Sequence, residues 1–176
     1  MAQYVSRFIP NYASITSPLR ELTRLDTPWT WNQRHEHAFQ NLQQVLASTQ
    51  VMEYFNTNKP SEIIVDASPT GLGAILTQDG KVISYASRAL SVVESRYSQT
   101  DREMLAVVWG TEHYHLYVYG STFTVRTDHK PLLGIFKSSK PASARIEGWR
   151  LRLTPHDFNL VYKPGRDDNN PADFLS

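Results

Sequence analysis

The sequence predicts an α/β domain preceded by a small helical segment, and three observations lead to this prediction. In the first part of the chain, apolar residues recur three or four positions apart, which is the period of an amphipathic helix. Beyond Lys59 the pattern becomes extended, with short β-branched runs and a two-residue turn signal. Farther along, helical and extended stretches alternate. The change of period places a domain boundary near Lys59, between a helical unit over 1–58 and a second domain over 59–176.

The helical unit is expected to contain helices joined by a tryptophan-containing turn. Phe8, Tyr12 and Ile15 share one helical face, and Pro18 permits a new helical turn after it. A turn over 27–31 precedes a second, amphipathic helix. The apolar stripe of that helix consists of Ala38, Phe39, Leu42, Val45 and Leu46. Such a stripe requires a partner surface.

Three strands are expected to open the second domain. The first is the β-branched run over 62–67, and the second spans 73–78. Asp79 and Gly80 predict a two-residue hairpin turn, because this pair accepts the left-handed backbone that such turns require. The third strand, over 81–87, then returns beside the second, so the three strands should be antiparallel.

Helices and strands are expected to alternate in the rest of the chain. A buried central helix is predicted over 98–117, and Ser98 or Thr100 can cap its first turn. Its apolar face should contain Leu105, Val108, Trp109 and Leu116. The remaining expected elements are a strand over 123–127, helices over 131–136 and 142–153, a strand over 158–162 and a closing turn over 171–175. The order is β-β-β-α-β-α-α-β-α.

Composition excludes several classes of protein and site. The 176 residues include 40% hydrophobic and 20% charged residues, as in a folded protein. There is no cysteine, so any metal must be held by carboxylates, histidines or backbone oxygens. No apolar run approaches the ~20 residues that span a bilayer, and no signal segment opens the chain, which predicts an intracellular protein without a membrane partner. The net charge of +1 argues against a strong free-standing nucleic-acid binder.

Four acidic residues are candidates for a metal site. Asp66 follows three apolar residues of the first strand, where an unpaired buried carboxylate would be costly. Asp128 ends the fourth strand, and two acids that converge from neighbouring strands call for a cation. Glu103 and Asp173 each lie at a helix start, where an acid is stabilised by the positive end of the helix. This structural role explains Glu103 as well as a metal site does, and it explains Asp173 better. Acids expected in a turn, a loop or on solvated faces are Asp79, Glu94, Asp101, Glu112, Asp167 and Asp168.

Short motifs occur along the whole chain in a fixed order. They are YVSRFIPNY (4–12), SPL (17–19), WTW (29–31), VDAS (65–68), GLGA (71–74), SYASR (84–88), EMLAVV (103–108), RTDHK (126–130), VYKPG (161–165) and NPADFLS (170–176). Together they resemble the ribonuclease H region of gypsy-class LTR retrotransposon Pol polyproteins, with the end of the reverse transcriptase before it. Each motif is weak alone, whereas the complete ordered set is a specific signal.

The resemblance implies a ribonuclease H-like fold, which is a five-stranded mixed sheet with helices on both sides, preceded by a helical remnant of reverse transcriptase. It implies an enzyme that cuts the RNA strand of RNA–DNA hybrids beside upstream reverse transcriptase domains. Asp66, Glu103, Asp128 and Asp173 would be the catalytic residues and would bind two Mg²⁺ ions, which Mn²⁺ could replace. In the family's scheme Asp66 bridges both ions, Asp173 helps to hold the ion that activates water, and the other two acids hold the second ion. Two cations ~3.5–4 Å apart suit phosphodiester hydrolysis, because they stabilise the entering and leaving oxygens.

Seven further residues are candidates for substrate contact. Four of them flank the acids in sequence, namely Ser68, Gln99, Thr100 and His129. For His129, which flanks Asp128, hydrogen bonding or packing is a more common role than catalysis. Arg145, Trp149 and Arg150 share one helix and could stack on and pair with a phosphate backbone, although a core tryptophan with solvated arginines explains the spacing equally well. Groove shape and ribose 2′-hydroxyls would select the hybrid.

Departures from the family pattern leave other functions open. The link from Leu133 to Ala142 is short where cellular relatives carry a basic insertion, and no histidine lies between Asp157 and Asp173. From residue 61 onward there are thirteen basic and thirteen acidic residues, so affinity for the hybrid should be weak and salt-sensitive. A catalytically weak or inert domesticated binding or scaffold module is the alternative, and a structural connection domain is a third. An active retrotransposon ribonuclease H would be located in cytoplasmic retroelement particles, whereas a domesticated copy could be nuclear.

Overall fold

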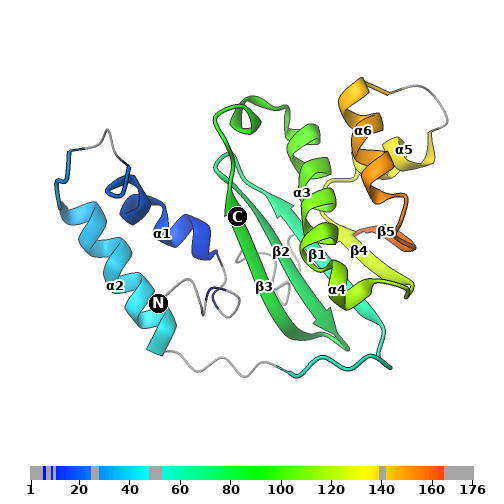
Figure 1. Ribbon diagram of the computed structural model, residues 1–176, viewed down its shortest axis with the longest axis horizontal. Helices are drawn as coiled ribbons and strands as arrows, with labels where there is room; N and C mark the ends of the chain where they lie inside the picture. Colours follow the sequence, from blue (N-terminus) through cyan, green and yellow to red (C-terminus); the bar gives the residue numbers. More distant parts are fainter. Residues whose placement is uncertain are drawn as a thin grey trace.

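A five-stranded mixed sheet forms the centre of the protein (Figure 1). The computed structural model describes residues 6, 9, 11–24, 28–47, 53–138 and 142–164. The strands β1 (Ser61–Ala67), β2 (Gly71–Gln78), β3 (Lys81–Ala89), β4 (Phe123–Thr127) and β5 (Phe158–Tyr162) lie in the order β3-β2-β1-β4-β5. β1, β2 and β3 are antiparallel neighbours, whereas β4 runs parallel to β1 and β5 parallel to β4. The predicted mixed sheet is therefore confirmed.

The turn between β2 and β3 is the predicted two-residue hairpin. Asp79 and Gly80 have φ angles of 51° and 74°, so both residues adopt the left-handed backbone that this turn needs. The flanking strands are longer than expected, because β2 begins at Gly71 and β3 continues to Ala89.

The central helix is shorter than predicted. α3 (Gln99–His113) ends before Tyr114, and a separate short helix α4 (His115–Val118) follows. The Tyr114 ring is buried, and its hydroxyl donates to the carbonyl of Ser84 at 2.8 Å, so the chain turns where this side chain enters the core. The expected place of Leu116 on the buried face is wrong, since 92% of its surface is exposed. The predicted cap is confirmed at Ser98, which accepts from Asp101 N at 3.1 Å.

α3 packs closely against the sheet, and both contribute to the main core. The main apolar cluster includes Ile63, Val65, Ala74, Leu76, Met104, Val107, Val108, Val125 and Leu153. A side chain at Gly110 would come within 2.9 Å of Val65 Cγ1, so glycine lets α3 lie close to β1. α5 (Pro131–Lys137) and α6 (Ala144–Leu153) lie beside α3 and β5 in Figure 1.

Two helices precede the sheet, and the first of them contacts it at β3. α1 (Tyr12–Glu21) packs against α2 (Gln33–Ala47), and Ala13 N donates to Ser87 Oγ at 2.9 Å. Pro18 does not start a new helix as expected but lies inside α1. A proline inside a helix removes one backbone hydrogen bond and crowds the carbonyl four residues earlier, and α1 continues past Pro18 despite this cost. No helix of the described ranges is long and apolar enough to cross a bilayer.

The chain before β1 is held by a buried amide. Gln78 Nε2 donates to the carbonyls of Asn56 (2.8 Å) and Lys59 (3.1 Å) and to Ser61 Oγ (3.1 Å). Its Oε1 accepts from Asn56 N at 2.9 Å. Several expectations lie outside the described residues, namely those for Phe8, the start of the turn at 27, Asp167, Asp168, Asp173 and the closing turn at 171–175.

Candidate metal centre

Three of the four candidate acids lie together at one edge of the sheet. Asp66 is on β1, Asp128 follows β4 and Glu103 is on α3. The parallel register pairs Ile64 with Arg126, so two residues farther along it brings Asp66 level with Asp128. One carboxylate oxygen from each acid lies within 4.8 Å of the others. The fourth candidate, Asp173, lies outside the described residues.

Glu103 is the most buried of the three acids, with 2% of its surface exposed. Its Oε1 accepts from Gln99 Nε2 at 2.5 Å, and its buried Oε2 has no hydrogen-bond partner among the described residues. Burial, followed by the charges of Asp66 and Asp128, raises the pKa of Glu103 to about 8. A carboxylate in this position is therefore costly unless a cation compensates its charge.

The cluster fits a hard divalent cation. All three donors are carboxylate oxygens, which Mg²⁺ and Mn²⁺ prefer. Asp128 is exposed and Asp66 half-buried, so the cluster is open on the Asp128 side to water and to a substrate. The buried, unpartnered oxygen of Glu103 provides a place for a positive charge in the protein interior.

The candidate substrate residues near the acids make internal hydrogen bonds. Gln99 Nε2 donates also to the carbonyl of Ala67 at 3.3 Å. Thr100 Oγ1 lies 3.1 Å from His129 Nε2. Ser68 Oγ accepts from Gly71 N at 2.9 Å, and thereby closes the turn between β1 and β2. Of these side chains Gln99 contacts an acid of the cluster directly, and contact of all four with a substrate stays a prediction.

The three candidates on α6 lie in different environments. Arg145 is 4.0 Å above the centre of the Tyr97 ring and pairs with Asp101 at 3.0 Å. Trp149 is buried and packs in the core. Arg150 pairs with Glu147 at 2.9 Å and donates to the carbonyls of Ile135 and Ser138 at the end of α5. Of the three, Arg145 has the most exposed side chain.

The expectation of a solvated face is confirmed for Glu112, which is exposed, and wrong for Glu94 and Asp101, which are partly buried. Each of the three acids pairs with an arginine. Glu94 accepts two hydrogen bonds of 2.8 Å from Arg88, which lower its pKa to about 2. Asp101 pairs with Arg145, and Glu112 with Arg152 at 2.6 Å. Sequence reasoning also missed the packing of Arg145 on the Tyr97 ring, since residues this far apart in sequence give no local signal.

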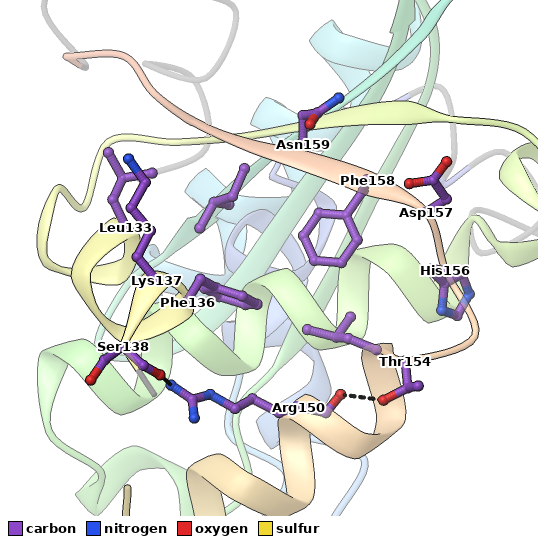
Figure 2. A pocket seen from close by; sticks show the side chains of 12 residues that line it. Leu133, Phe136, Lys137, Ser138, Arg150, Thr154, His156, Asp157, Phe158 and Asn159 are labelled. Atoms are coloured by element: carbon purple, nitrogen blue, oxygen red, sulfur yellow. Dashed lines mark hydrogen bonds between the residues drawn. The ribbon is translucent and has the colours of Figure 1, made fainter. Parts of the chain in front are cut away.

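A separate pocket of about 580 Å³ lies between α5, α6 and the start of β5 (Figure 2). Phe136 and Phe158 form apolar walls, and Lys137, Arg150 and His156 contribute polar groups. None of Asp66, Glu103 and Asp128 lines it, so this pocket is distinct from the carboxylate cluster.

The sequence profile of the RNase H-like domain found in reverse transcriptase matches residues 56–156. The chain belongs to this family. It is 36% identical over 179 residues to the retrovirus-related Pol polyprotein from transposon 297 of Drosophila melanogaster, covering 98% of this chain and 16% of that protein. It is 33% identical over 189 residues to that from transposon gypsy of the same species, covering 100% of this chain and 18% of the relative. The resemblance found in the motifs is thus confirmed, and this RNase H-like chain spans less than a fifth of either relative.

Solved structures support the same fold. The foamy viral protease-reverse transcriptase in complex with RNA/DNA hybrid superposes with a TM-score of 0.78 at 18% identity, covering 97% of this chain and 24% of that one. RNase H1 from Halobacterium salinarum gives a TM-score of 0.53 at 17% identity, covering 66% of this chain and 93% of that one. The ribonuclease H-like fold of this RNase H-like chain is therefore established.

Proposed function

We propose that this chain hydrolyses the RNA strand of RNA–DNA hybrids as the ribonuclease H part of a retrotransposon reverse transcriptase. The convergence of Asp66, Glu103 and Asp128 within 4.8 Å carries the proposal. Such a cluster has no stabilising value of its own, because like charges at this distance repel. The substrate is inferred from the Pol polyproteins among the relatives and from the hybrid-bound structural neighbour.

Asp66, Glu103 and Asp128, with Asp173 as a fourth ligand, would hold two Mg²⁺ ions, for which Mn²⁺ could substitute. Bound divalent cations would make a water molecule easier to ionise and would stabilise the charge that develops on the leaving oxygen. The contribution of the chain is to hold the acids close together before substrate arrives. Gln99 contributes to this task, because its amide fixes one oxygen of Glu103 and leaves the other available.

Substrate would approach from the exposed side of Asp128. Ser68, Gln99, Thr100 and His129 lie around the acids, where spare hydrogen-bonding capacity could meet ribose hydroxyls and phosphates. Arg145 would meet the backbone at the same end of α3, because Asp101 and Tyr97 hold its guanidinium there. Trp149 and Arg150 would act indirectly, through the packing of α6.

A cleavage assay tests the proposal. The full chain is incubated with a labelled RNA–DNA hybrid, duplex DNA and duplex RNA, each in Mg²⁺, in Mn²⁺ and in EDTA. Cleavage of the RNA strand of the hybrid alone, only with a divalent cation and only with Asp66 intact, is the expected result. Asp79→Asn is the matched control, because it removes an equivalent charge at the hairpin, where asparagine accepts the same positive φ.

The alternative function is that of an inert binding or scaffold module. A folded chain that binds the hybrid but cuts none of the three substrates would favour this alternative. Cleavage by Asp66→Asn at the parental rate would show that these acids are not the active site.

A further inference from the structure

We propose that His129 is a positioning residue, which together with Thr100 braces α3 against the end of β4 and sets the spacing of the carboxylates. This inference rests on the proposed function in one respect, namely that the acids hold a divalent cation. This role is separate from substrate contact and from proton transfer, because the brace would act on the cation site through Asp128 and Glu103.

The hydrogen bond between His129 and Thr100 joins two of the elements that carry the acids. Thr100 Oγ1 lies 3.1 Å from His129 Nε2, and the two residues are 29 positions apart in sequence. His129 directly follows Asp128, and Thr100 precedes Glu103 by about one helical turn. The bond therefore joins α3 to the end of β4, which are the two elements that carry Glu103 and Asp128.

The histidine is well fixed at its backbone. His129 N donates to the buried Thr127 Oγ1 at 3.1 Å, and its carbonyl accepts from Leu132 N at 3.1 Å at the start of α5. The ring is half-buried. A side chain fixed in this way can transmit the position of α3 to the strand end.

A second tie joins the same turn of α3 to the other acid-bearing strand. Gln99 Nε2 donates to the carbonyl of Ala67, which directly follows Asp66, at 3.3 Å. The adjacent residues Gln99 and Thr100 thus connect α3 to the residue after Asp66 and to the residue after Asp128. The first turn of the helix is held at both strands that supply carboxylates.

The brace would oppose the electrostatic repulsion among the three acids. Asp128 is exposed at the end of its strand, so repulsion would move it outward if nothing joined this strand end to α3. Cation binding would then have to reassemble the site, and affinity would fall. Groups that orient metal ligands commonly change metal affinity by about ten- to a hundredfold.

Binding of Mn²⁺ to the full chain, measured from the electron paramagnetic resonance signal of free Mn²⁺, tests the brace without requiring cleavage. Thr100→Val removes the hydroxyl and keeps the shape, and His129→Phe removes the ring nitrogens and keeps a ring. Each variant should bind Mn²⁺ about tenfold more weakly. The double variant should be no weaker than the weaker single variant, because one bond is lost in all three. Thr100→Ser and His129→Gln, which keep hydrogen-bonding groups, should retain most of the affinity.

Thr122→Val is the matched control. It removes a hydrogen bond of 2.5 Å to Asp157 at the opposite end of β4, and should leave Mn²⁺ affinity unchanged. The brace is overturned if Thr100→Val and His129→Phe bind like the parent, if their losses multiply in the double variant, or if the parent binds no Mn²⁺. If His129→Phe does not fold, equal affinities of Thr100→Val and Thr100→Ser overturn it. A parent that binds Mn²⁺ with coupled losses but does not cut the hybrid refutes the proposed function and leaves the brace in place.

Discussion

Gln99 Nε2 donates to Glu103 Oε1 at 2.5 Å, across one turn of α3, and so fixes a carboxyl group that is almost completely buried. The other oxygen of Glu103 has no hydrogen-bond partner among the described residues. This asymmetry leaves one oxygen of Glu103 available to a cation. The protonation of Glu103 should therefore be measurable through its effect on stability.

The stability of the metal-free protein should fall as pH rises. The pKa of Glu103 is raised from 4.5 to about 8, so the folded state binds more protons than the unfolded state between these values. The stabilising contribution is complete below about pH 4.5 and is lost as pH rises to about 8, with a slope of no more than about 1.4 kcal/mol per pH unit. Urea unfolding in EDTA at pH 5 and pH 8 measures this change. Glu103→Gln should lose this part of the pH dependence, and an unchanged dependence would contradict the assignment.

Removing a charge from the cluster should affect cation binding and stability in opposite directions. Asp66→Asn should abolish cleavage and most of the increase in Tm that Mg²⁺ gives the parent. In EDTA its Tm should equal or exceed that of the parent, because repulsion with Glu103 and Asp128 falls. Thermal unfolding with and without Mg²⁺ measures both effects. Asp79→Asn should keep the parental response to Mg²⁺, and a similar loss in that control would contradict a local effect.

Binding to the hybrid should be weak and should fall as the salt concentration rises. Basic and acidic residues are equal in number from residue 61 onward, so the net attraction to the hybrid is small, and the basic side chains that meet phosphates release counterions. Fluorescence anisotropy at a series of salt concentrations, in Ca²⁺ to prevent cleavage, gives the slope. Arg145→Ala should reduce the slope by about one ion. Arg152→Ala, which removes a similarly exposed arginine paired with Glu112, should not change it.

The core hydroxyl of Tyr114 should contribute measurably to folding. It donates to the carbonyl of Ser84 at 2.8 Å and lies 3.3 Å from that of Ala74, both away from water. Tyr114→Phe should lower the free energy of unfolding by about 1–3 kcal/mol, because a buried acceptor loses its donor. Urea denaturation measures the loss. Tyr119→Phe, at a position that is 68% exposed, should have little effect.

The sheet and the candidacy of Asp66 were predictable because their signals are local, whereas Glu103 was equally well explained as an acid at a helix start and joined the set through the family resemblance. A β-branched run ending in Asp66 and the Asp79-Gly80 turn each report the conformation of a few neighbouring residues. The break at Tyr114 was not predictable, since it follows from a side chain that reaches two other strands. The pairing of Asp101 with Arg145 joins residues 44 positions apart and has no periodic signal. The pairing of Glu94 with Arg88 depends equally on how the loop after β3 folds back.

The close packing of α3 on β1 at Gly110 helps to fix the position of the candidate site. Glu103 lies about two turns earlier on the same helix, so whatever displaces α3 from β1 also displaces Glu103 from Asp66. One additional methyl group at Gly110 would meet Val65 at 2.9 Å and Ala74 at 3.2 Å. A homologue that keeps every acid but carries a larger residue here could therefore be an inactive pseudoenzyme. Surveys that infer activity from acidic motifs alone would misclassify it, and adding this one small residue to the search pattern would test the inference across genomes.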